Sequence, residues 1–213
     1  GARLVFSSEL GEERRHTPGD DVVTALVNGE LDGKPLSEPD LLTYCKFLLV
    51  AGTETTRNLI SSGVDLLARH PDQRRELTEN PNLLPAAVEE MLRVISPVVA
   101  FCRTATSDTE IHGQRIAAGD YVAMLFASAN RDEEIWADPD RFDVKRDTDR
   151  AHVAFGFGPH VCLGATLARM EARVLFEELL QVYPEFVVVG PPISGPSTLV
   201  SMVSRLPAVF GPR

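Results

Sequence analysis

A long helical pattern lies in the first third of the chain. The tetrapeptide Ser37-Glu38-Pro39-Asp40 resembles a capping box with proline in the first turn, which predicts the start of a helix. No further proline occurs before Pro71, so the helix can continue to His70. About thirty residues at ~1.5 Å each make a rod of ~45 Å, long enough to cross a whole domain. Residues 41–52 are apolar on most faces, which predicts that the first half of this helix is buried.

Shorter elements of both kinds are expected around this helix. Helical patterns cover residues 20–28, 72–78, 85–95 and 163–182, and a helix end with a connector precedes Pro18. β patterns extend from residue 97 to 127, with a hairpin at 111–116, a strand at 121–126, and further short strands within 186–209. Residues 130–150 are rich in Asp, Arg and Pro without periodicity, which predicts an ordered meander. The predicted fold class is therefore mainly α with small β-sheets.

Composition disfavours several classes of protein. The chain has 213 residues, 44% of them hydrophobic and 24% charged, which is ordinary for a soluble globular protein. Its net charge of −10 disfavours broad contact with nucleic acid or an anionic membrane, because both need a basic surface. The longest apolar stretches are too short to cross a bilayer, and three widely spaced cysteines argue against a disulfide framework. We therefore expect a reducing, cytoplasmic location.

A loop rich in glycine carries the most specific chemistry of the chain. Residues 155–164 read Phe-Gly-Phe-Gly-Pro-His-Val-Cys-Leu-Gly and place Cys162 at the N-terminus of the helix expected over 163–182. Glycines let a backbone fold tightly and approach a flat ligand closely, and a helix N-terminus stabilises a thiolate. Cys45 and Cys102 lack such surroundings, and we expect them to be small buried side chains.

Two other uses of Cys162 fit the sequence less well. His160 and Cys162 could form a nucleophile pair, but two residues apart on a tight loop they point in different directions, and no third orienting group is evident. A zinc site would need a second Cys/His pair at ligand spacing, which the sequence lacks. The pattern therefore favours neither a cysteine hydrolase nor a zinc protein.

The pattern Phe-Gly-x-Gly-x-His-x-Cys-x-Gly resembles the signature of the cytochrome P-450 family, and every fixed position of that signature is present. Three further segments match the family in the right order: Ala51-Gly52-Thr53-Glu54-Thr55-Thr56, Glu90-Met91-Leu92-Arg93 and Pro139-Asp140-Arg141-Phe142. The resemblance covers essentially the whole chain and is to the bacterial soluble type. It implies the C-terminal half of the cytochrome P-450 fold, with residues 1–213 forming a single, partial haem domain that lacks the N-terminal half.

The resemblance implies a haem b cofactor whose iron is bound by the Cys162 thiolate, an arrangement that favours O–O cleavage. Arg103 and His160 would bind the haem propionates, since a bidentate arginine suits a carboxylate. Without the resemblance, Arg103 reads as the solvated end of an apolar strand. The implied cofactor-binding residues are Ala51, Gly52, Arg103, Phe155, Gly156, His160, Cys162 and Gly164, with Cys162 as the metal ligand.

Glu54 and Thr55 are the implied catalytic pair. Thr55 would hydrogen-bond the bound dioxygen species, and Glu54, where many relatives have aspartate, would deliver protons from solvent. The small residues Ala51 and Gly52 would let the helix backbone pass over the haem, and a local opening of the helix would make room for oxygen. The plainer alternative is a helix that reaches the surface here, with Thr55 bonding back to the preceding turn.

Glu90, Arg93 and Arg141 are implied to form a buried ion network beneath the cysteine loop. The i,i+3 spacing puts Glu90 and Arg93 on one helix face. Most such pairs are exposed and worth ~0–1 kcal/mol, whereas removing one member of a buried network costs ~3–5 kcal/mol. We therefore expect these three residues to have a structural role.

The implied activity is that of a haem-thiolate monooxygenase, which inserts one oxygen atom from O2 into a C–H bond of an apolar organic substrate. Electrons would come from NAD(P)H through a ferredoxin-type donor and its reductase, because the chain has neither flavin- nor iron–sulfur-binding motifs. Glu54 and Thr55 make a peroxide-driven haem enzyme the less favoured option. The segments expected to line the substrate side are 47–48, Ala51, 98–99, Phe101 and 199–200, although ordinary core packing explains them equally well.

The chain is about half as long as bacterial members of the family. The absent part would supply the early helices, a further propionate-binding segment and the helices that roof the pocket. Apolar faces would then be exposed, which predicts self-association or a partner chain that covers the missing half, and weak haem binding or none. The alternative function is therefore a non-catalytic haem-binding or structural fragment of such an enzyme.

Overall fold

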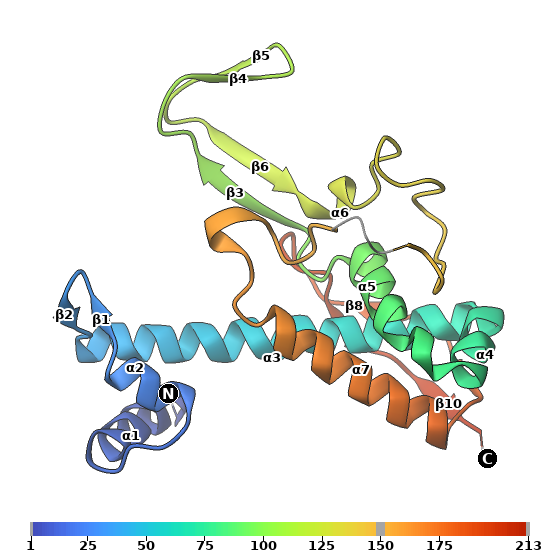
Figure 1. The fold of residues 1–213 in the computed structure, drawn as a ribbon, viewed down its shortest axis with the longest axis horizontal. Coiled ribbons are helices and arrows are strands. Elements are labelled where there is room, and N and C mark those ends of the chain that lie inside the picture. The colour runs from blue at the N-terminus through green and yellow to red at the C-terminus, as the bar shows by residue number, and fades with distance from the viewer. Residues whose placement is uncertain (1, 148–151, 212–213) are drawn as a thin grey trace. The chain divides into compact units, whose positions relative to one another are not determined.

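The computed structural model describes residues 2–147 and 152–211 (Figure 1). The chain divides into two compact units, Gly1–Glu54 and Thr55–Arg213, and one helix, α3 (Glu38–Arg69), contributes to both. The described residues form mainly helices, with small two-stranded sheets, as predicted. None of the helices in this part of the chain has the length and apolarity that a membrane span requires.

The first unit contains short elements around the start of α3. They are α1 (Ala2–His16), α2 (Val22–Val27), β1 (Glu30–Leu31) and β2 (Lys34–Pro35). The Asp21 carboxylate caps α2 by accepting the Thr24 N–H at 2.8 Å. β1 and β2 pair around Asp32 and Gly33, which both have positive φ. The helix predicted over 20–28 is confirmed in shorter form. The hairpin and the full length of α1 were not predicted, because their sequences have no strong apolar period.

α3 begins where the capping pattern predicted. The Ser37 hydroxyl donates to the Asp40 carboxylate at 2.5 Å and accepts the Asp40 N–H at 3.3 Å. The expected burial of residues 41–52 is wrong for this chain: Leu41 is the one buried residue of that segment, whereas Phe47 is 67% exposed. The apolar faces of this segment therefore need cover that the described residues do not supply.

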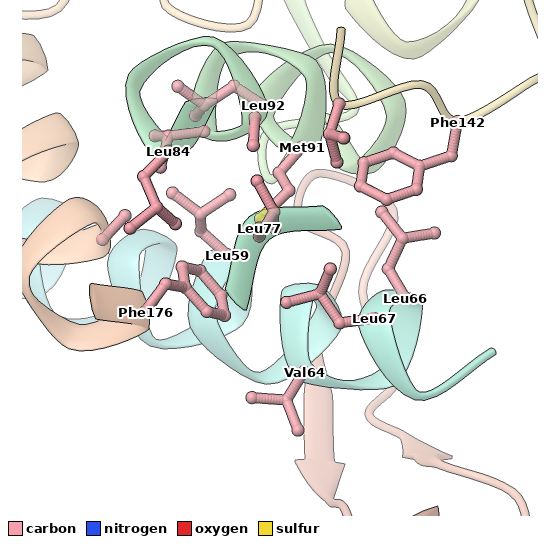
Figure 2. Packing of buried hydrophobic residues seen from close by; sticks show 14 of the residues in the cluster. Leu59, Val64, Leu66, Leu67, Leu77, Leu84, Met91, Leu92, Phe142 and Phe176 are labelled. Carbon is pink, nitrogen blue, oxygen red and sulfur yellow. The ribbon is translucent and has the colours of Figure 1, made fainter. Parts of the chain in front are cut away.

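The core of the second unit lies among helices. These are the second part of α3 together with α4 (Pro71–Glu79), the 3-10 turn η1 (Pro81–Leu83), α5 (Leu84–Ile95) and α7 (Ala165–Val182). Figure 2 shows Leu59, Leu77, Met91 and Phe176 pointing into this common core, and all four are buried. A Cβ at Gly63 of α3 would lie 2.5 Å from Phe176 Cζ, so only glycine permits this close approach. The predicted helices are confirmed, with ends shifted by one or two residues.

Within the described residues of the second unit there are four antiparallel strand pairs. They are β3 (Ala100–Thr104) with β6 (Tyr121–Leu125), β4 (Thr109–Ile111) with β5 (Gln114–Ile116), β7 (Phe186–Val188) with β10 (Ala208–Phe210), and β8 (Ile193–Ser194) with β9 (Val203–Arg205). The predicted hairpin at 111–116 is confirmed, and His112 and Gly113 form its turn with φ of 48° and 77°. The strand predicted over 121–126 ends one residue earlier, because α6 (Phe126–Ala129) begins there.

A connector without helix or strand covers residues 130–147. Trp136, Phe142 and Val144 are buried, so the connector is packed against the rest of its unit. The predicted ordered meander is confirmed for these residues, and its last part, 148–150, lies outside the described residues.

Candidate functional site

Cys162 lies at the end of a tight loop that leads into α7. The loop contains the 3-10 turn η2 (Gly158–His160). Gly156 and Gly158 have φ of 72° and 75°, a region that favours glycine. The Cys162 N–H donates to the Phe155 carbonyl at 2.9 Å and thereby closes the loop. The glycines of the sequence pattern are thus explained by the backbone path.

The Cys162 side chain is exposed beside the first turn of α7. Gly164 is the N-cap residue of α7, and no side chain caps this helix end. A Cβ at Gly164 would lie 3.9 Å from Cys162 Sγ, so the sulfur lies close to the helix N-terminus. The helix dipole there favours a negatively charged ligand atom.

The other two cysteines lie in different surroundings. Cys45 on α3 is partly buried, and burial raises the pKa of its thiol. Cys102 is exposed on β3, so the expected burial of this side chain is wrong. Most of β3 is exposed, and among the described residues this strand pairs with β6 alone.

The donor set around Cys162 limits which metal could bind. Among the described residues, no group of three His, Cys, Asp or Glu side chains could hold a metal ion. A bare ion needs several protein ligands, whereas haem iron, held by its macrocycle, needs few from the protein. A Cβ at Gly158 would meet no atom within 4 Å in the described chain, so the loop leaves open space. A single exposed thiol on an open glycine loop therefore fits haem.

Buried Asn130 connects the cysteine loop to the end of α5. Its Nδ2 donates to Ser96 Oγ at 2.8 Å, and its Oδ1 accepts the Val153 N–H at 2.7 Å. Ser96 is the C-cap residue of α5, with φ of 44°, and its hydroxyl donates to the Arg93 carbonyl at 3.0 Å. The segment that precedes Phe155 is therefore tied to α5.

Glu90 and Arg93 form a buried ion pair on α5. Arg93 Nε and Nη2 donate to the two Glu90 carboxylate oxygens at 2.7 and 2.8 Å, and both side chains are 1% exposed. Arg93 also donates to the backbone carbonyls of residues 130, 139 and 141. The pair therefore holds the 130–147 connector against α5.

The second arginine of this network is Arg146, not Arg141. Arg146 Nε donates to Glu90 Oε1 at 3.0 Å, and its Nη atoms donate to the carbonyls of residues 137, 138 and 141. Arg141 contributes its carbonyl to Arg93, while its side chain is 62% exposed and pairs with Asp143 at 3.2 Å. The prediction of a Glu90–Arg93–Arg141 network is wrong in its third member, because the backbone of residue 141 faces the network and its side chain does not.

A second charged cluster, which sequence patterns did not suggest, begins at the neighbouring residue Glu89. Arg169 of α7 donates through Nε and Nη2 to the Glu89 carboxylate at 2.7 and 2.9 Å, and His152 Nε2 lies 3.1 Å from Glu89 Oε2. The Arg169 guanidinium lies over the Phe155 ring, and the His152 ring is also paired with that ring. We call Glu89, His152 and Arg169 the Phe155 clamp. The sequence signal for it is weak: a histidine and an arginine that flank the cysteine loop.

The Phe155 clamp favours the charged form of Glu89. Burial raises the pKa of this carboxyl, but hydrogen bonds from His152 and Arg169 outweigh burial and lower the pKa to about 2. The hydrogen bonds with Glu89 raise the pKa of Arg169, and the Cys162 side chain acts in the same direction. At neutral pH the cluster therefore holds a paired carboxylate and guanidinium.

Arg103 and His160, the expected propionate ligands, are exposed in the second unit. Arg103 lies on β3, where its Nη1 donates to the adjacent Cys102 carbonyl at 3.0 Å. His160 ends η2, two residues before Cys162, so the structure places it in the cysteine loop. In the described part of the chain, no hydrogen bond links either side chain to Cys162. Their role toward a haem remains a prediction.

Ala51, Gly52, Glu54 and Thr55 lie on α3 around the boundary of the two units. The helix is continuous here, so the local opening that the family resemblance implies is absent from α3 in this structure. Among the described residues, a Cβ at Gly52 would meet no atom within 4 Å. The helix surface is therefore open at Gly52, and the roles of the four residues remain predictions.

Comparison with known proteins covers most of the chain. The cytochrome P450 family model matches residues 7–187. The chain is 41% identical over 209 residues to a Steroid C26-monooxygenase of Mycolicibacterium smegmatis. This match covers 97% of this chain and 52% of that relative. It is 49% identical over 179 residues to a Linalool 8-monooxygenase of Pseudomonas putida. This match covers 84% of this chain and 44% of that relative. The chain thus spans about half the length of the curated relatives it matches.

Solved structures agree with these relatives. The crystal structure of CYP108D1 from Novosphingobium aromaticivorans superimposes with a TM-score of 0.92 and 39% identity, over 100% of this chain and 51% of that chain. Together with the cysteine loop, these matches define the class: the chain belongs to the cytochrome P450 family. It has the fold of the C-terminal half of that family, and the family implies a haem cofactor.

Proposed function

We propose that Cys162 is the thiolate ligand of a haem iron and that the whole protein is a haem-thiolate monooxygenase. The observation that carries the proposal is the exposed Cys162 thiol, oriented by the Phe155 carbonyl and placed at the N-terminus of α7. The open glycine loop beside it leaves space for a flat group. Family membership supports the same ligand.

The other site residues would bind haem b and leave room for it. When bound, haem b would supply the iron that binds and activates O2. The residues in contact with it would be Ala51, Gly52, Arg103, Phe155, Gly156, His160, Cys162 and Gly164. Arg103 and His160 would bind the two propionates, because a guanidinium and an imidazole can donate hydrogen bonds to carboxylates. Ala51 and Gly52 would allow close approach of the α3 backbone.

Glu54 and Thr55 would handle protons on the oxygen-binding side. Thr55 would offer its hydroxyl as a hydrogen-bond donor on the oxygen-binding side, and the Glu54 carboxylate would receive protons from solvent and pass them inward. The two residues are adjacent in the sequence of α3. This pair favours a monooxygenase over a protein that only holds haem.

The whole protein would insert one oxygen atom of O2 into a C–H bond of an apolar organic substrate. The names of two relatives, a steroid monooxygenase and a linalool monooxygenase, support an apolar substrate. Electrons would come from NAD(P)H through a ferredoxin-type donor and its reductase. We place the protein in the cytoplasm and interpret residues 1–213 as a single, partial haem domain.

The ferrous carbon monoxide spectrum of the haem-loaded chain tests the iron ligand. We expect a strongly red-shifted Soret band, because thiolate ligation changes the electronic structure of the iron. Cys162→Ser should abolish that band, and Cys102→Ser, which changes another exposed thiol, should retain it. A haem-loaded chain whose spectrum lacks the red-shifted band would contradict the proposal.

The alternative, a non-catalytic haem-binding or structural fragment, is favoured by an open apolar groove between α3 and α7. The groove is lined by apolar side chains, among them Ile60, Val64, Met170, Val174, Leu175 and Val182. An apolar surface of this kind predicts self-association or a partner chain. Failure of the chain to acquire any haem spectrum would support the fragment.

A further inference from the structure

Phe155 is held by two side chains of the Phe155 clamp. The Arg169 guanidinium lies 4.5 Å from the centroid of the Phe155 ring. The His152 ring lies 6.0 Å from the same ring at an interplanar angle of 42°. Phe155 also packs against the buried core of its unit. The ring is therefore restrained by contacts with both clamp residues and the core.

Glu89 fixes the positions of both residues that contact this ring. Its carboxylate accepts two hydrogen bonds from Arg169, at 2.7 and 2.9 Å. A bidentate arginine–carboxylate pair has one preferred geometry, so it holds the plane of the guanidinium. The Glu89 side chain is 24% exposed and comes from α5, the helix that packs against α7.

The hydrogen bonds of His152 indicate which nitrogen of its neutral ring carries the proton. Its side chain is 6% exposed. Its Nδ1 accepts the Ala154 N–H at 3.2 Å, so in the neutral ring the proton is on Nε2. Nε2 then donates to Glu89 Oε2, 3.1 Å away. The ring is thus oriented from both of its nitrogens.

Phe155 is also the residue that orients Cys162. Its carbonyl accepts the Cys162 N–H at 2.9 Å. A rotation of the Phe155 backbone would move this acceptor and change the direction in which Cys162 leaves the loop. A continuous series of contacts therefore runs from Glu89, through Arg169 and His152, to Phe155 and the backbone of Cys162.

We propose that the three residues of the Phe155 clamp are positioning residues for the cysteine ligand. By restraining Phe155, Glu89, His152 and Arg169 set the orientation of Cys162 toward the haem iron. The inference rests on the proposed function, because the orientation matters for chemistry only if Cys162 binds iron. The clamp is distinct from the Glu90–Arg93 pair, whose hydrogen bonds go to the 130–147 connector.

Amide hydrogen exchange at cysteine tests the clamp without haem. The chain has three cysteines, so isotope-labelled cysteine gives three amide signals, of which Cys45 and Cys102 are internal references. Glu89→Gln keeps the shape of the side chain but loses the bidentate acceptor. We expect exchange at Cys162 to become roughly 5- to 10-fold faster, with little change at the references.

Two substitutions on α7 form the matched pair for this experiment. Arg169→Gln should have the same effect as Glu89→Gln. Arg173→Gln removes an exposed arginine from the same helix and should leave all three amides unchanged. Equal acceleration at all three cysteines would indicate general loosening and would overturn the proposal. So would unchanged exchange at Cys162 in both clamp variants.

Spectra and reduction potentials of the haem-loaded full chain provide the second readout. Glu89→Gln and Arg169→Gln should shift the midpoint potential and add a Soret component that is not thiolate-ligated, whereas Arg173→Gln should change neither. Arg169→Lys keeps the charge but loses the planar fork, so it should behave like Arg169→Gln. Full rescue by lysine would show that charge alone acts, and would overturn a positioning role.

The two readouts separate this inference from the proposed function. If the unsubstituted chain binds haem without a thiolate spectrum, the proposed function fails. The exchange experiment still decides whether the Phe155 clamp holds Cys162. If the unsubstituted spectrum is that of a thiolate and the clamp variants match it in potential, band position and exchange, the clamp proposal alone fails.

Discussion

Two neighbouring glutamates of α5 each bind an arginine, but their surroundings differ. Glu90 and its partner Arg93 are both 1% exposed, and their network includes Arg146 and several backbone carbonyls of the 130–147 connector. Glu89 is 24% exposed, and its partner Arg169 is 41% exposed. The first network binds the connector, whereas the second, the Phe155 clamp, binds the cysteine loop and α7.

The difference follows from helix geometry and burial. Consecutive residues of a helix point about 100° apart, so Glu89 and Glu90 meet different parts of the chain. A fully buried charge that loses its partner cannot be solvated, whereas a partly exposed one can. We therefore expect the Glu90 network to maintain the fold and the Phe155 clamp to control local geometry.

Glu90→Gln should have the largest effect on stability. The carboxamide removes the negative charge and leaves Arg93 buried without a full counter-charge. We expect the free energy of unfolding to fall by ~3–5 kcal/mol, measured by urea denaturation followed by circular dichroism. Glu89→Gln at the adjacent position is the control and should cost much less. Equal losses in the two variants would contradict the distinction based on burial.

Arg146→Ala should lower the free energy of unfolding by less than Glu90→Gln but by more than Arg141→Ala. Arg146 is 13% exposed and bonds Glu90 and three carbonyls, so its removal should cost about 2–3 kcal/mol. Arg141 is 62% exposed in a surface pair, so its removal should cost ~0–1 kcal/mol. The same denaturation measurement compares them. The opposite order would restore Arg141 as the arginine of the buried network.

Those parts of the fold that depend on local patterns could be predicted from the sequence. The capping box at residues 37–40, the proline at position 71 and the apolar period define α3 to within two residues. The burial of residues 41–52 could not be predicted in the same way. Apolar periodicity shows that a helix face needs cover, but the cover comes from other segments. In this chain Phe47 therefore remains exposed.

In the site, too, features set by residues close in the sequence could be predicted, and contacts between residues far apart in the sequence could not. The Cys162 loop could be predicted, because its glycines and cysteine act within ten residues of one another. The choice between Arg141 and Arg146 depends on how the connector backbone turns, which residue type does not reveal. The Phe155 clamp joins residues 63 and 80 positions from Glu89, and no spacing rule connects them.

The smallest expected effect concerns the pH dependence of stability. Folding lowers the pKa of Glu89 from 4.5 to about 2. A carboxyl whose pKa is lowered by folding stabilises the folded chain above its unfolded pKa, and this contribution is lost as pH falls from about 4.5 toward 2. Solvent screening at the 41%-exposed Arg169 reduces it to on the order of 1 kcal/mol.

Glu89→Gln should therefore be less stable than the unsubstituted chain near neutral pH, and the difference should vanish as pH falls through that window. Urea denaturation at a series of pH values measures it. Among the described residues, Arg169 and His152 are the charged and titratable groups that contact the Glu89 carboxylate, and the variant leaves both side chains in place. Glu171→Gln, at an exposed position of α7, is the matched control and should not reproduce the convergence. A difference that stays constant at low pH would mean that His152 and Arg169 do not hold Glu89 in its charged form, and the Phe155 clamp would lose its electrostatic basis.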